Sequence, residues 1–426
     1  MLDIRRLRAE PEAVKEALGR RDASLPQAVD VILSRDEARR QAIGEVNELK
    51  AQRNIVSKQV GELKRAGQDA SAIIEQTRAL GERIAELDDV VREADEFIRH
   101  HLLLIPNEPY RRVPAGGEEA NEVLSIWGAP VTFDFEAQPH WSIGENLGIL
   151  DLPRGSKISG SGFPVLVGHG ARLQRGLINF FLDVHTEEHG YTEVRVPYLV
   201  SPESMTATGQ LPKFAEESYR SERDDLWLVP TAEVPVTNLH RDELLTVEDL
   251  PRRYTAYSPC FRREAGAAGK DTRGLLRVHQ FDKVELVRFE TPERGLEALE
   301  ELTGEVETLL KRLGLHHRRL LLATGDLGQS GAMTYDLEVW APGVKKWLEV
   351  SSCTTFTDFQ ARRGNIRFRR SQSEKPEFVH TLNGSGLALP RVIAALLETF
   401  QEPDGSVSLP EVLHPYVGVQ RLTAST

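Results

Sequence analysis

Two runs of residues in the first hundred positions repeat at alternating intervals of four and three, and most of their members are apolar. That spacing brings one side chain per turn onto a single stripe of a helix, which is typical of a coiled-coil seam. The first run comprises Ala28, Ile32, Arg35, Arg39, Ala42, Val46, Leu49, Arg53, Val56, Val60 and Leu63. The second comprises Ile73, Thr77, Leu80, Ile84, Leu87, Val91, Ala94 and Ile98. The pattern predicts two long helices.

The segment between the two runs predicts a reversal of the chain. Gly67 is suited to end a helix, and Asp69 or Ser71 can cap the helix that follows. We therefore expect an antiparallel coiled-coil hairpin over about residues 27–101. At about 1.5 Å per residue the first helix would be roughly 50 Å long, so it cannot pack along its whole length on a compact domain.

Chain length and two prolines predict how the chain is divided. With 426 residues it exceeds the roughly 250 to 300 residues that one hydrophobic core usually spans. Pro106 and Pro109 break the second helix and begin a linker. We expect a helical domain at residues 1–105, beginning with one short amphipathic helix at 4–20, and a second domain at 106–426.

Basic residues gather in the far half of the first long helix, where Glu62 is the only acid between positions 50 and 65. They are Lys50, Arg53, Lys58, Lys64 and Arg65. The returning helix is rich in acids instead. A basic stripe on a long arm suits the phosphate backbone of an RNA that is recognised by shape rather than by its bases. Dimerisation or simple spacing is the alternative use of such an arm.

Composition narrows the class of protein. The formal net charge of −12 argues against general attraction to nucleic acid, so any RNA contact must be local. The only two cysteines, Cys260 and Cys353, can form neither a disulfide framework nor a four-cysteine zinc site, and we expect buried thiols. Apolar runs stay short of the roughly 18 residues of a membrane span, and the first residues do not resemble a signal peptide. We expect a cytoplasmic protein without a membrane partner.

From about residue 130 onward, short apolar runs alternate with helical periods and turn signals. The β-rich stretches lie around 194–200, 227–230, 254–262, 278–289 and 346–356. Their order is not a βαβ repeat and carries neither a dinucleotide-binding nor a P-loop signature, so the pattern indicates an α+β fold. His185 and His189 stand one helical turn apart, but Thr186 breaks the metalloprotease pattern, and we expect a solvated helix end there.

Charged residues recur inside strand-like segments, where folding would remove their water. Arg262 and Glu264 share one face of a strand, and a returning strand carries Phe281 and Glu285. A hairpin with these groups could bind a phosphate, a base edge, a base face and an ammonium group, respectively. The alternative is an ordinary hairpin surface that is covered by salt bridges.

Two later segments add groups of the same kind. Glu349 lies in an apolar strand with the Ser352 hydroxyl three residues later, and hard oxygens such as these suit Mg²⁺. Residues 380–391 are expected to form a polar turn that leads into a helix, with Arg391 in its first turn. The helix dipole disfavours a cation there unless an anion lies beside it, so Arg391 is a candidate phosphate ligand.

These segments together resemble the sequence motifs of the seryl-tRNA synthetase family of class II aminoacyl-tRNA synthetases. The first motif resembles the helix 173–184 followed by the strand 192–196, which ends at Pro197; the second resembles Phe261-Arg262-Arg263-Glu264-Ala265-Gly266 with its returning segment 278–285; the third resembles 386–391. Family-specific signatures also match at 209–214, 231–233 and 349–352, and so does the N-terminal hairpin. The resemblance covers nearly the whole chain.

The resemblance implies an antiparallel β-sheet catalytic domain flanked by helices, with the N-terminal antiparallel coiled-coil arm as the tRNA-binding domain. It implies ATP-dependent activation of L-serine to seryl-adenylate, followed by transfer of the seryl group to the 3′ end of tRNA(Ser), with tRNA(Sec) as a further substrate. It also implies a homodimer formed through the first motif around Pro197. The rival hypotheses are a synthetase-like paralogue that loads another carrier or serves as a regulator, and a coiled-coil scaffold with an inert head.

Residue roles follow from the resemblance alone. The catalytic residues would be Arg262 and Arg391. ATP would be bound by Arg262, Arg263, Glu264, Val278, His279, Gln280, Phe281, Glu349, Val350, Ser351, Ser352 and Arg391, and Mg²⁺ by Glu349 and Ser352. Serine would be bound by Thr231, Ala232, Glu233, Arg262, Glu285, Asn383 and Ser385. Arg263 stands where the family pattern has a small residue, so its side chain is expected to point away from ATP.

Overall fold

The structure is a computed structural model that describes residues 1–264 and 273–424. The chain divides into two compact units, one formed by Leu2–Pro106 and the other by Asn107–Thr426 together with Met1. No helix among the described residues is long and apolar enough to cross a membrane.

The first unit consists of four helices rather than the three that the sequence predicts. Residues 4–20 form α1 (Ile4–Ala9) and α2 (Pro11–Gly19) instead of one continuous helix. Pro11 is the cause, since proline lacks a backbone N–H and disfavours helical dihedrals in the residue before it. Glu10 accordingly leaves the helical region, with φ −134° and ψ 52°.

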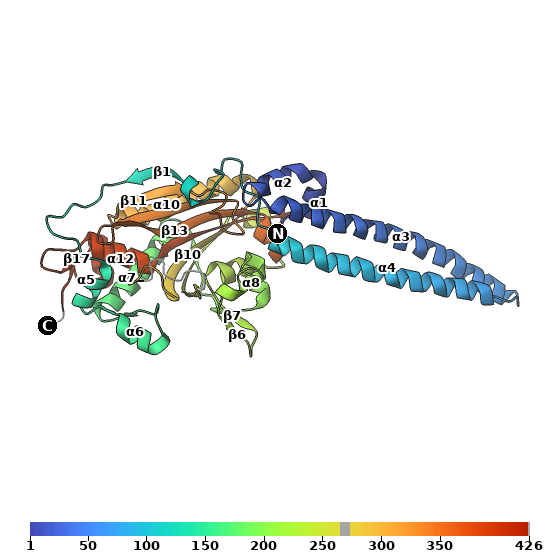
Figure 1. Cartoon of the computed structure of the whole chain (residues 1–426), viewed down its shortest axis with the longest axis horizontal. Coiled ribbons are helices and arrows are strands. Elements are labelled where there is room, and N and C mark those ends of the chain that lie inside the picture. The colour runs from blue at the N-terminus through green and yellow to red at the C-terminus, as the bar shows by residue number, and fades with distance from the viewer. Residues whose placement is uncertain (265–272, 425–426) are drawn as a thin grey trace. The chain divides into compact units, whose positions relative to one another are not determined.

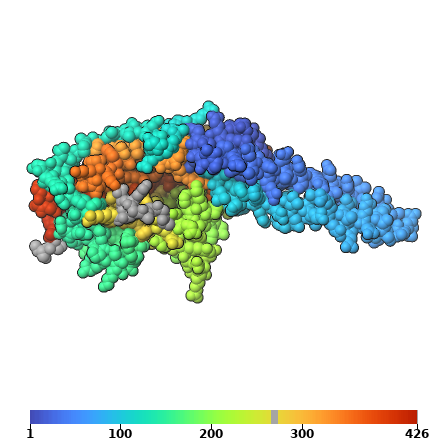
Figure 2. Space-filling model, in the orientation of Figure 1, coloured from blue at the N-terminus to red at the C-terminus, as the bar shows by residue number. Residues whose placement is uncertain are grey.

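The two long helices are α3 (Leu25–Arg65) and α4 (Ser71–Leu104), and they lie side by side along their length (Figure 1). With 41 residues at about 1.5 Å each, α3 is about 60 Å long, which exceeds the predicted length. The predicted seam packs as a coiled coil, and Ala42 and Val46 bury their side chains against Ile84 and Leu87. In the space-filling view the two helices form one continuous surface (Figure 2).

The reversal of the hairpin uses the residues that the sequence singles out. Gly67 adopts a positive φ of 69°, a conformation that glycine reaches without steric cost. The Asp69 carboxylate accepts hydrogen bonds from the Ser71 backbone N–H at 2.9 Å and from its hydroxyl at 2.6 Å. Together these contacts end one helix and start the next within six residues.

The second unit is built on an eight-stranded sheet in the order β1-β11-β12-β13-β16-β10-β9-β4. The strands are β1 (Glu122–Trp127), β4 (Thr192–Glu193), β9 (Arg252–Phe261), β10 (Gln280–Glu290), β11 (His317–Leu321), β12 (Met333–Ala341), β13 (Lys346–Thr357) and β16 (His380–Ala388). All neighbours are antiparallel except β4 and β9. The core lies between this sheet and three long helices: α7 (His169–Glu187), α10 (Gly295–Arg312) and α12 (Leu389–Thr399). The predicted α+β class is confirmed.

Smaller elements surround this sheet. They are α5 (His140–Asn146), β2 (Leu150–Asp151), α6 (Leu152–Ser159), β3 (Val165–Leu166), β5 (Leu199–Val200), α8 (Pro202–Thr208), β6 (Arg220–Ser221), β7 (Leu226–Leu228), α9 (Glu233–Thr237), β8 (Leu244–Thr246), α11 (Phe359–Gly364), β14 (Arg367–Arg369), β15 (Glu377–Phe378), β17 (Val407–Ser408), α13 (His414–Val417) and β18 (Arg421–Leu422). Six short 3₁₀ turns complete the elements of the described residues.

Two local predictions are wrong. The stretch 194–200 is mostly irregular between β4 and β5, because Pro197 cannot donate a ladder hydrogen bond. Residues 380–388 form the central strand β16 rather than a polar turn. Period-two alternation explains the second error, since Asn383 and Ser385 face the candidate site while Leu382 and Gly384 face the core under α10.

Candidate active site

One cavity of about 470 Å³ brings together groups that are far apart in the sequence. Arg262 at the end of β9, Glu349 on β13 and Arg391 on α12 all line it, as the sequence predicts. The lining also includes Gln210, Thr231, Glu233, Glu264, Arg277, Val278, Phe281, Lys283, Val350, Ser352, Asn383 and Ser385. The cavity therefore combines three arginines with carboxylates and small polar groups.

Arg391 and Glu349 contact each other directly. The Arg391 guanidinium donates to the Glu349 backbone carbonyl at 2.8 Å and lies 3.5 Å from its carboxylate, while Nε donates to the Leu276 carbonyl at 3.1 Å. Arg391 is the third residue of α12, where the positive end of the helix dipole opposes a cation. A guanidinium held there with donors to spare is suited to an anionic ligand.

Arg262 is held in place against the floor of the same cavity. Its Nε donates to the Pro230 carbonyl at 3.3 Å, and its guanidinium carbon lies 5.2 Å from the centre of the Phe281 ring. Phe281 lies opposite Cys260 on the neighbouring strand, so β9 and β10 hold the cation and the ring in register. The aromatic face and the arginine form one platform.

The opposite end of the cavity holds two buried carboxylates, Glu233 and Glu285. The Thr231 hydroxyl donates to Glu285 at 2.9 Å, and the Lys283 ammonium forms an ion pair with the same carboxylate. The Asn383 amide donates to both carboxylates, at 3.0 Å each. Glu285 is fully buried and is not among the lining residues. Its contacts Thr231, Lys283 and Asn383 line the cavity instead.

Burial and the neighbouring Glu285 raise the pKa of Glu233 to about 7. Burial is the larger cause, because it removes the water that stabilises the charged form. The site therefore holds a carboxylate that is ready to gain a positive partner.

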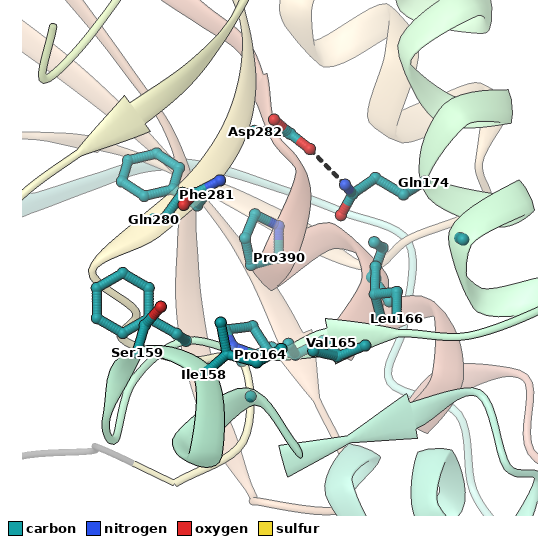
Figure 3. A pocket seen from close by; sticks show the side chains of 15 residues that line it. Ile158, Ser159, Pro164, Val165, Leu166, Gln174, Gln280, Phe281, Asp282 and Pro390 are labelled. Carbon is teal, nitrogen blue, oxygen red and sulfur yellow. Dashed lines mark hydrogen bonds between the residues drawn. The ribbon is translucent and has the colours of Figure 1, made fainter. Parts of the chain in front are cut away.

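A second cavity, whose lining side chains are drawn in Figure 3, shares Leu275, Phe281 and Pro390 with the first. Gln280 lines this second cavity and not the first, together with α6 residues such as Ile158. Asp282 also lines it and accepts hydrogen bonds from the Gln174 amide of α7 and from the Tyr257 hydroxyl, the latter at 2.9 Å. Strand β10 thus carries both Phe281 and Asp282, and the hydrogen bond of Asp282 to Gln174 connects this strand to α7.

A third cavity of about 550 Å³ continues from the first and shares Glu233, Glu349 and Ser352 with it. Its walls are acidic and include Asp336, whose buried Oδ1 has no hydrogen-bond partner among the described residues. Burial and the nearby Glu349 raise the pKa of Asp336 well above its usual value.

Several residues that the resemblance assigns to the site do not line the cavity. Arg263 is exposed and is not among the lining residues, and its backbone N–H donates to the Glu217 carbonyl at 2.9 Å. His279 is half-buried and is not among the lining residues; its backbone N–H donates to the Gly162 carbonyl, and its Nδ1 lies 3.2 Å from the Arg262 carbonyl oxygen. Ala232 is buried, and so is Ser351, whose hydroxyl donates to the Ser385 carbonyl at 2.6 Å. Ala265 and Gly266, which extend the second motif, lie outside the described residues.

Two charged residues of the cavity are absent from the sequence-based site. Arg277 lies 3.4 Å from Glu264, and Lys283 pairs with Glu285. Strand alternation could have revealed Lys283, because it lies two residues before Glu285 on the same strand. Arg277 precedes β10, where no period applies.

His185 is buried and His189 is half-buried, so the prediction of a solvated helix end is wrong for His185. His185 and His189 lie with their Nδ1 atoms 3.0 Å apart, and burial lowers the pKa of His185 to about 3. Among the described residues no group of three His, Cys, Asp or Glu side chains could hold a metal ion. The two cysteines are free and buried, as predicted.

The basic residues of the helical unit differ in their availability. Lys50 approaches Asp88 of α4 at 3.5 Å, and Arg53 is half-buried. Lys58, Lys64 and Arg65 are exposed near the end of α3.

Both units match models of known protein families. Residues 1–109 match the family described as seryl-tRNA synthetase N-terminal domain, and residues 214–400 match the tRNA synthetase class II core domain (G, H, P, S and T). The chain is 57% identical over 420 residues to the serine–tRNA ligase of Gemmatimonas aurantiaca, covering 98% of this chain and 99% of the relative.

Solved structures resemble the chain over its full length. Seryl-tRNA synthetase from Pyrococcus horikoshii, complexed with ATP, superposes with a TM-score of 0.95 at 37% identity and covers 100% of both chains. The cytoplasmic serine-tRNA ligase from Naegleria fowleri, in complex with AMP, gives a TM-score of 0.89 at 28% identity, covering 100% of this chain and 99% of that one.

Proposed function

The chain belongs to the seryl-tRNA synthetase family of the class II aminoacyl-tRNA synthetases, and from this premise we propose how its cavity works. The enzyme activates L-serine with ATP and transfers the seryl group to tRNA. The observation that carries the proposal is the convergence of Arg262, Glu349 and Arg391 on the cavity that also holds Glu233.

The arginine end of the cavity binds the triphosphate. Arg262 takes the α-phosphate and the serine carboxylate, and Arg391 takes the γ-phosphate. Phe281 stacks under adenine, and the half-buried Glu264 faces the base edge. Both arginines now donate to backbone carbonyls and retain further N–H donors, which supports this assignment.

The carboxylate end binds serine. Glu233 and Glu285 attract the ammonium group, while the hydroxyls of Thr231 and Ser385 and the Asn383 amide surround the side chain. A site built to hydrogen-bond a hydroxyl rejects alanine, because its own polar groups would be left unpaired. Threonine must instead be excluded by its extra methyl group.

Magnesium fits the oxygen donors at the junction of the two cavities. Glu349 and Ser352 offer the hard oxygens that this ion prefers, and Asp336 lies opposite Ser352 on the neighbouring strand. Since no group of three His, Cys, Asp or Glu side chains among the described residues could hold the ion, phosphate oxygens and water would complete its shell. Mg²⁺ bound there would neutralise part of the negative charge of the phosphates.

The chemistry needs no general base. The serine carboxylate is already ionised at neutral pH, so its attack on the α-phosphorus requires alignment and relief of repulsion between anions. Arg262 contacts both reacting groups and provides that relief. The new bond joins a carboxylate oxygen to phosphorus, and the bond to pyrophosphate breaks. The 3′-terminal hydroxyl of tRNA then takes the seryl group, and AMP leaves.

The arm binds the tRNA. The exposed Lys58, Lys64 and Arg65, with Arg53 and Lys50 beside them, contact the phosphate backbone, so that binding weakens as salt rises. The tRNA substrates are tRNA(Ser) and tRNA(Sec). The helical unit at its predicted limits, 1–105, serves as the tRNA-binding domain, and 106–426 as the catalytic domain.

A homodimer forms through the first motif around Pro197. The surface of α7 and β4 holds a groove lined by residues such as Ile178 and Arg195, which supports contact with a second copy. The compartment is the cytoplasm, where the two free thiols of the chain would stay reduced.

The test is exchange of radiolabelled pyrophosphate into ATP with serine, threonine, alanine or glycine, each supplied alone and without tRNA. Exchange that depends on serine at least a hundredfold more strongly than on the other three supports the proposal. An equal response to all four, or to none, refutes it. Transfer of labelled serine to tRNA(Ser) and to tRNA(Sec) then tests the second step.

A further inference from the structure

Gln360 is a buried glutamine of α11 that belongs to none of the sequence motifs, yet it contacts the serine end of the cavity from behind. Its Nε2 donates to the Glu233 carboxylate at 2.6 Å and to the Thr208 carbonyl at 3.3 Å. Its Oε1 accepts from the Thr381 hydroxyl at 2.8 Å. Both partners of the NH₂ group can only accept, so the orientation of the amide is fixed.

Glu233 and Glu285 differ in what holds them. Glu285 has a fixed cation, Lys283, in an ion pair. Glu233 accepts hydrogen bonds from two neutral amides, one from Gln360 at Oε1 and one from Asn383 at Oε2, and it forms no salt bridge within the described residues. The charge of Glu285 is thus balanced within the protein, whereas that of Glu233 is not.

This difference matters for an ammonium ligand. A lysine or arginine in place of Gln360 would neutralise Glu233 and repel the incoming ammonium group. A neutral donor instead stabilises the ionised carboxylate without competing for it. Of the two acids, Glu233 also lines the cavity itself, while Glu285 lies behind it.

We propose that Gln360, supported by Thr381, is a positioning residue that holds Glu233 ionised and correctly oriented, so that Glu233 is the principal partner of the amino acid's ammonium group. Gln360 itself does not line the cavity and does not touch substrate. The inference rests on the proposed function, because it requires an amino acid in this cavity.

The experiment uses the full-length enzyme and serine-dependent pyrophosphate exchange between pH 6 and 8.5. Gln360→Met keeps the length of the side chain and removes its donors. We expect the KM for serine to rise about tenfold at pH 7.5, with the KM for ATP changed by less than about twofold. The midpoint of the pH dependence of kcat/KM for serine should move upward, since Glu233 then loses a donor to its charged form.

Other charged groups also face Glu233, namely Glu285, Lys283 and Arg262. Because Gln360→Met leaves all three in place, a shifted midpoint reports the lost amide. Thr381→Val removes only the hydroxyl behind Gln360 and should shift the KM for serine in the same direction by about twofold to threefold. If Gln360→Met does not fold, Thr381→Val still tests the inference.

Gln401→Met is the matched control, since Gln401 is a buried glutamine that donates to the backbone carbonyls of Gln138 and Glu398. It should lower thermal stability and leave both KM values and the pH midpoint unchanged. An unchanged KM for serine and pH midpoint in Gln360→Met, or equal increases in both KM values, would overturn the inference alone. Lack of serine-dependent exchange in the unaltered enzyme would overturn the proposed function and this inference together.

Discussion

The two ends of the cavity hold their charges in different ways. At the serine end, Glu233 and Glu285 are buried and hydrogen-bonded to side chains, so their positions are set before any ligand arrives. At the phosphate end, the Arg391 and Glu349 side chains are 29% and 47% exposed and contact each other. We therefore expect a preorganised pocket to select the small amino acid, and we expect ATP to bind at the more open end, where Arg391 and Glu349 can exchange their present contacts for phosphate oxygens and Mg²⁺.

The largest expected effect comes from Arg262, which joins the two ends. Arg262→Ala should lower the rate of serine-dependent pyrophosphate exchange by about a hundredfold to a thousandfold, because a preorganised donor to the reacting anions is lost. Single-turnover formation of seryl-adenylate in a rapid-quench instrument measures it. An effect on KM for only one substrate would show that Arg262 serves one end and not their junction.

Glu233→Gln should separate the serine end from the phosphate end. Loss of a charged partner for the ammonium group should raise the KM for serine about tenfold to a hundredfold and leave the KM for ATP nearly unchanged. Steady-state exchange at varied concentrations of each substrate measures both constants. If the KM for ATP rose in parallel, the two ends would not be distinct.

Arg391→Ala is the converse test at the phosphate end. The KM for ATP should rise about tenfold to thirtyfold, since one charge-assisted contact to phosphate is lost, while the KM for serine stays within about twofold. The same exchange assay serves. A change confined to serine would contradict the assignment of Arg391 to the triphosphate.

The pH dependence should also differ between the two ends. With a pKa of about 7 in the free enzyme, Glu233 is mostly protonated at pH 6 and mostly ionised at pH 8. Serine binding needs the ionised form, so the KM for serine should rise about tenfold for each pH unit below about 7 and level off above it. The KM for ATP, followed in parallel, should lack this inflection. A KM for serine that stayed flat from pH 6 to 8 would contradict the role of Glu233.

The smallest effect is expected from substitutions in the arm, which should change tRNA binding and leave the reaction in the cavity unaltered. Lys58→Glu with Lys64→Glu should raise the KM for tRNA about fivefold and weaken its dependence on salt, while exchange without tRNA stays unchanged. Arg99→Glu, an exposed charge reversal on α4, is the control. Unaltered tRNA charging would remove these lysines from the tRNA surface.

The sequence predicted much of the molecule, and the errors have physical causes. The hairpin followed from its period because apolar side chains of α3 and α4 pack against each other along one seam, and the convergence of Arg262, Glu349 and Arg391 followed from motif resemblance. The sequence of residues 380–388 predicts a turn rather than β16, because the polar side chains that face the cavity in this strand are also typical of loops.

Some parts of the site could not be predicted from the sequence. The sequence does not indicate the role of Gln360, because that role depends on contacts to Thr208, Glu233 and Thr381, which are distant along the chain. No local pattern encodes such contacts.

The most direct test of the account is a crystal structure of the enzyme with MgATP and a serine analogue whose carboxylate cannot react. The account predicts one bound triphosphate, with Arg262 at the α-phosphate, Arg391 at the γ-phosphate and Glu349 beside the metal, and the analogue's ammonium against Glu233. A nucleotide seated elsewhere, or an ammonium group bound away from Glu233, would contradict it.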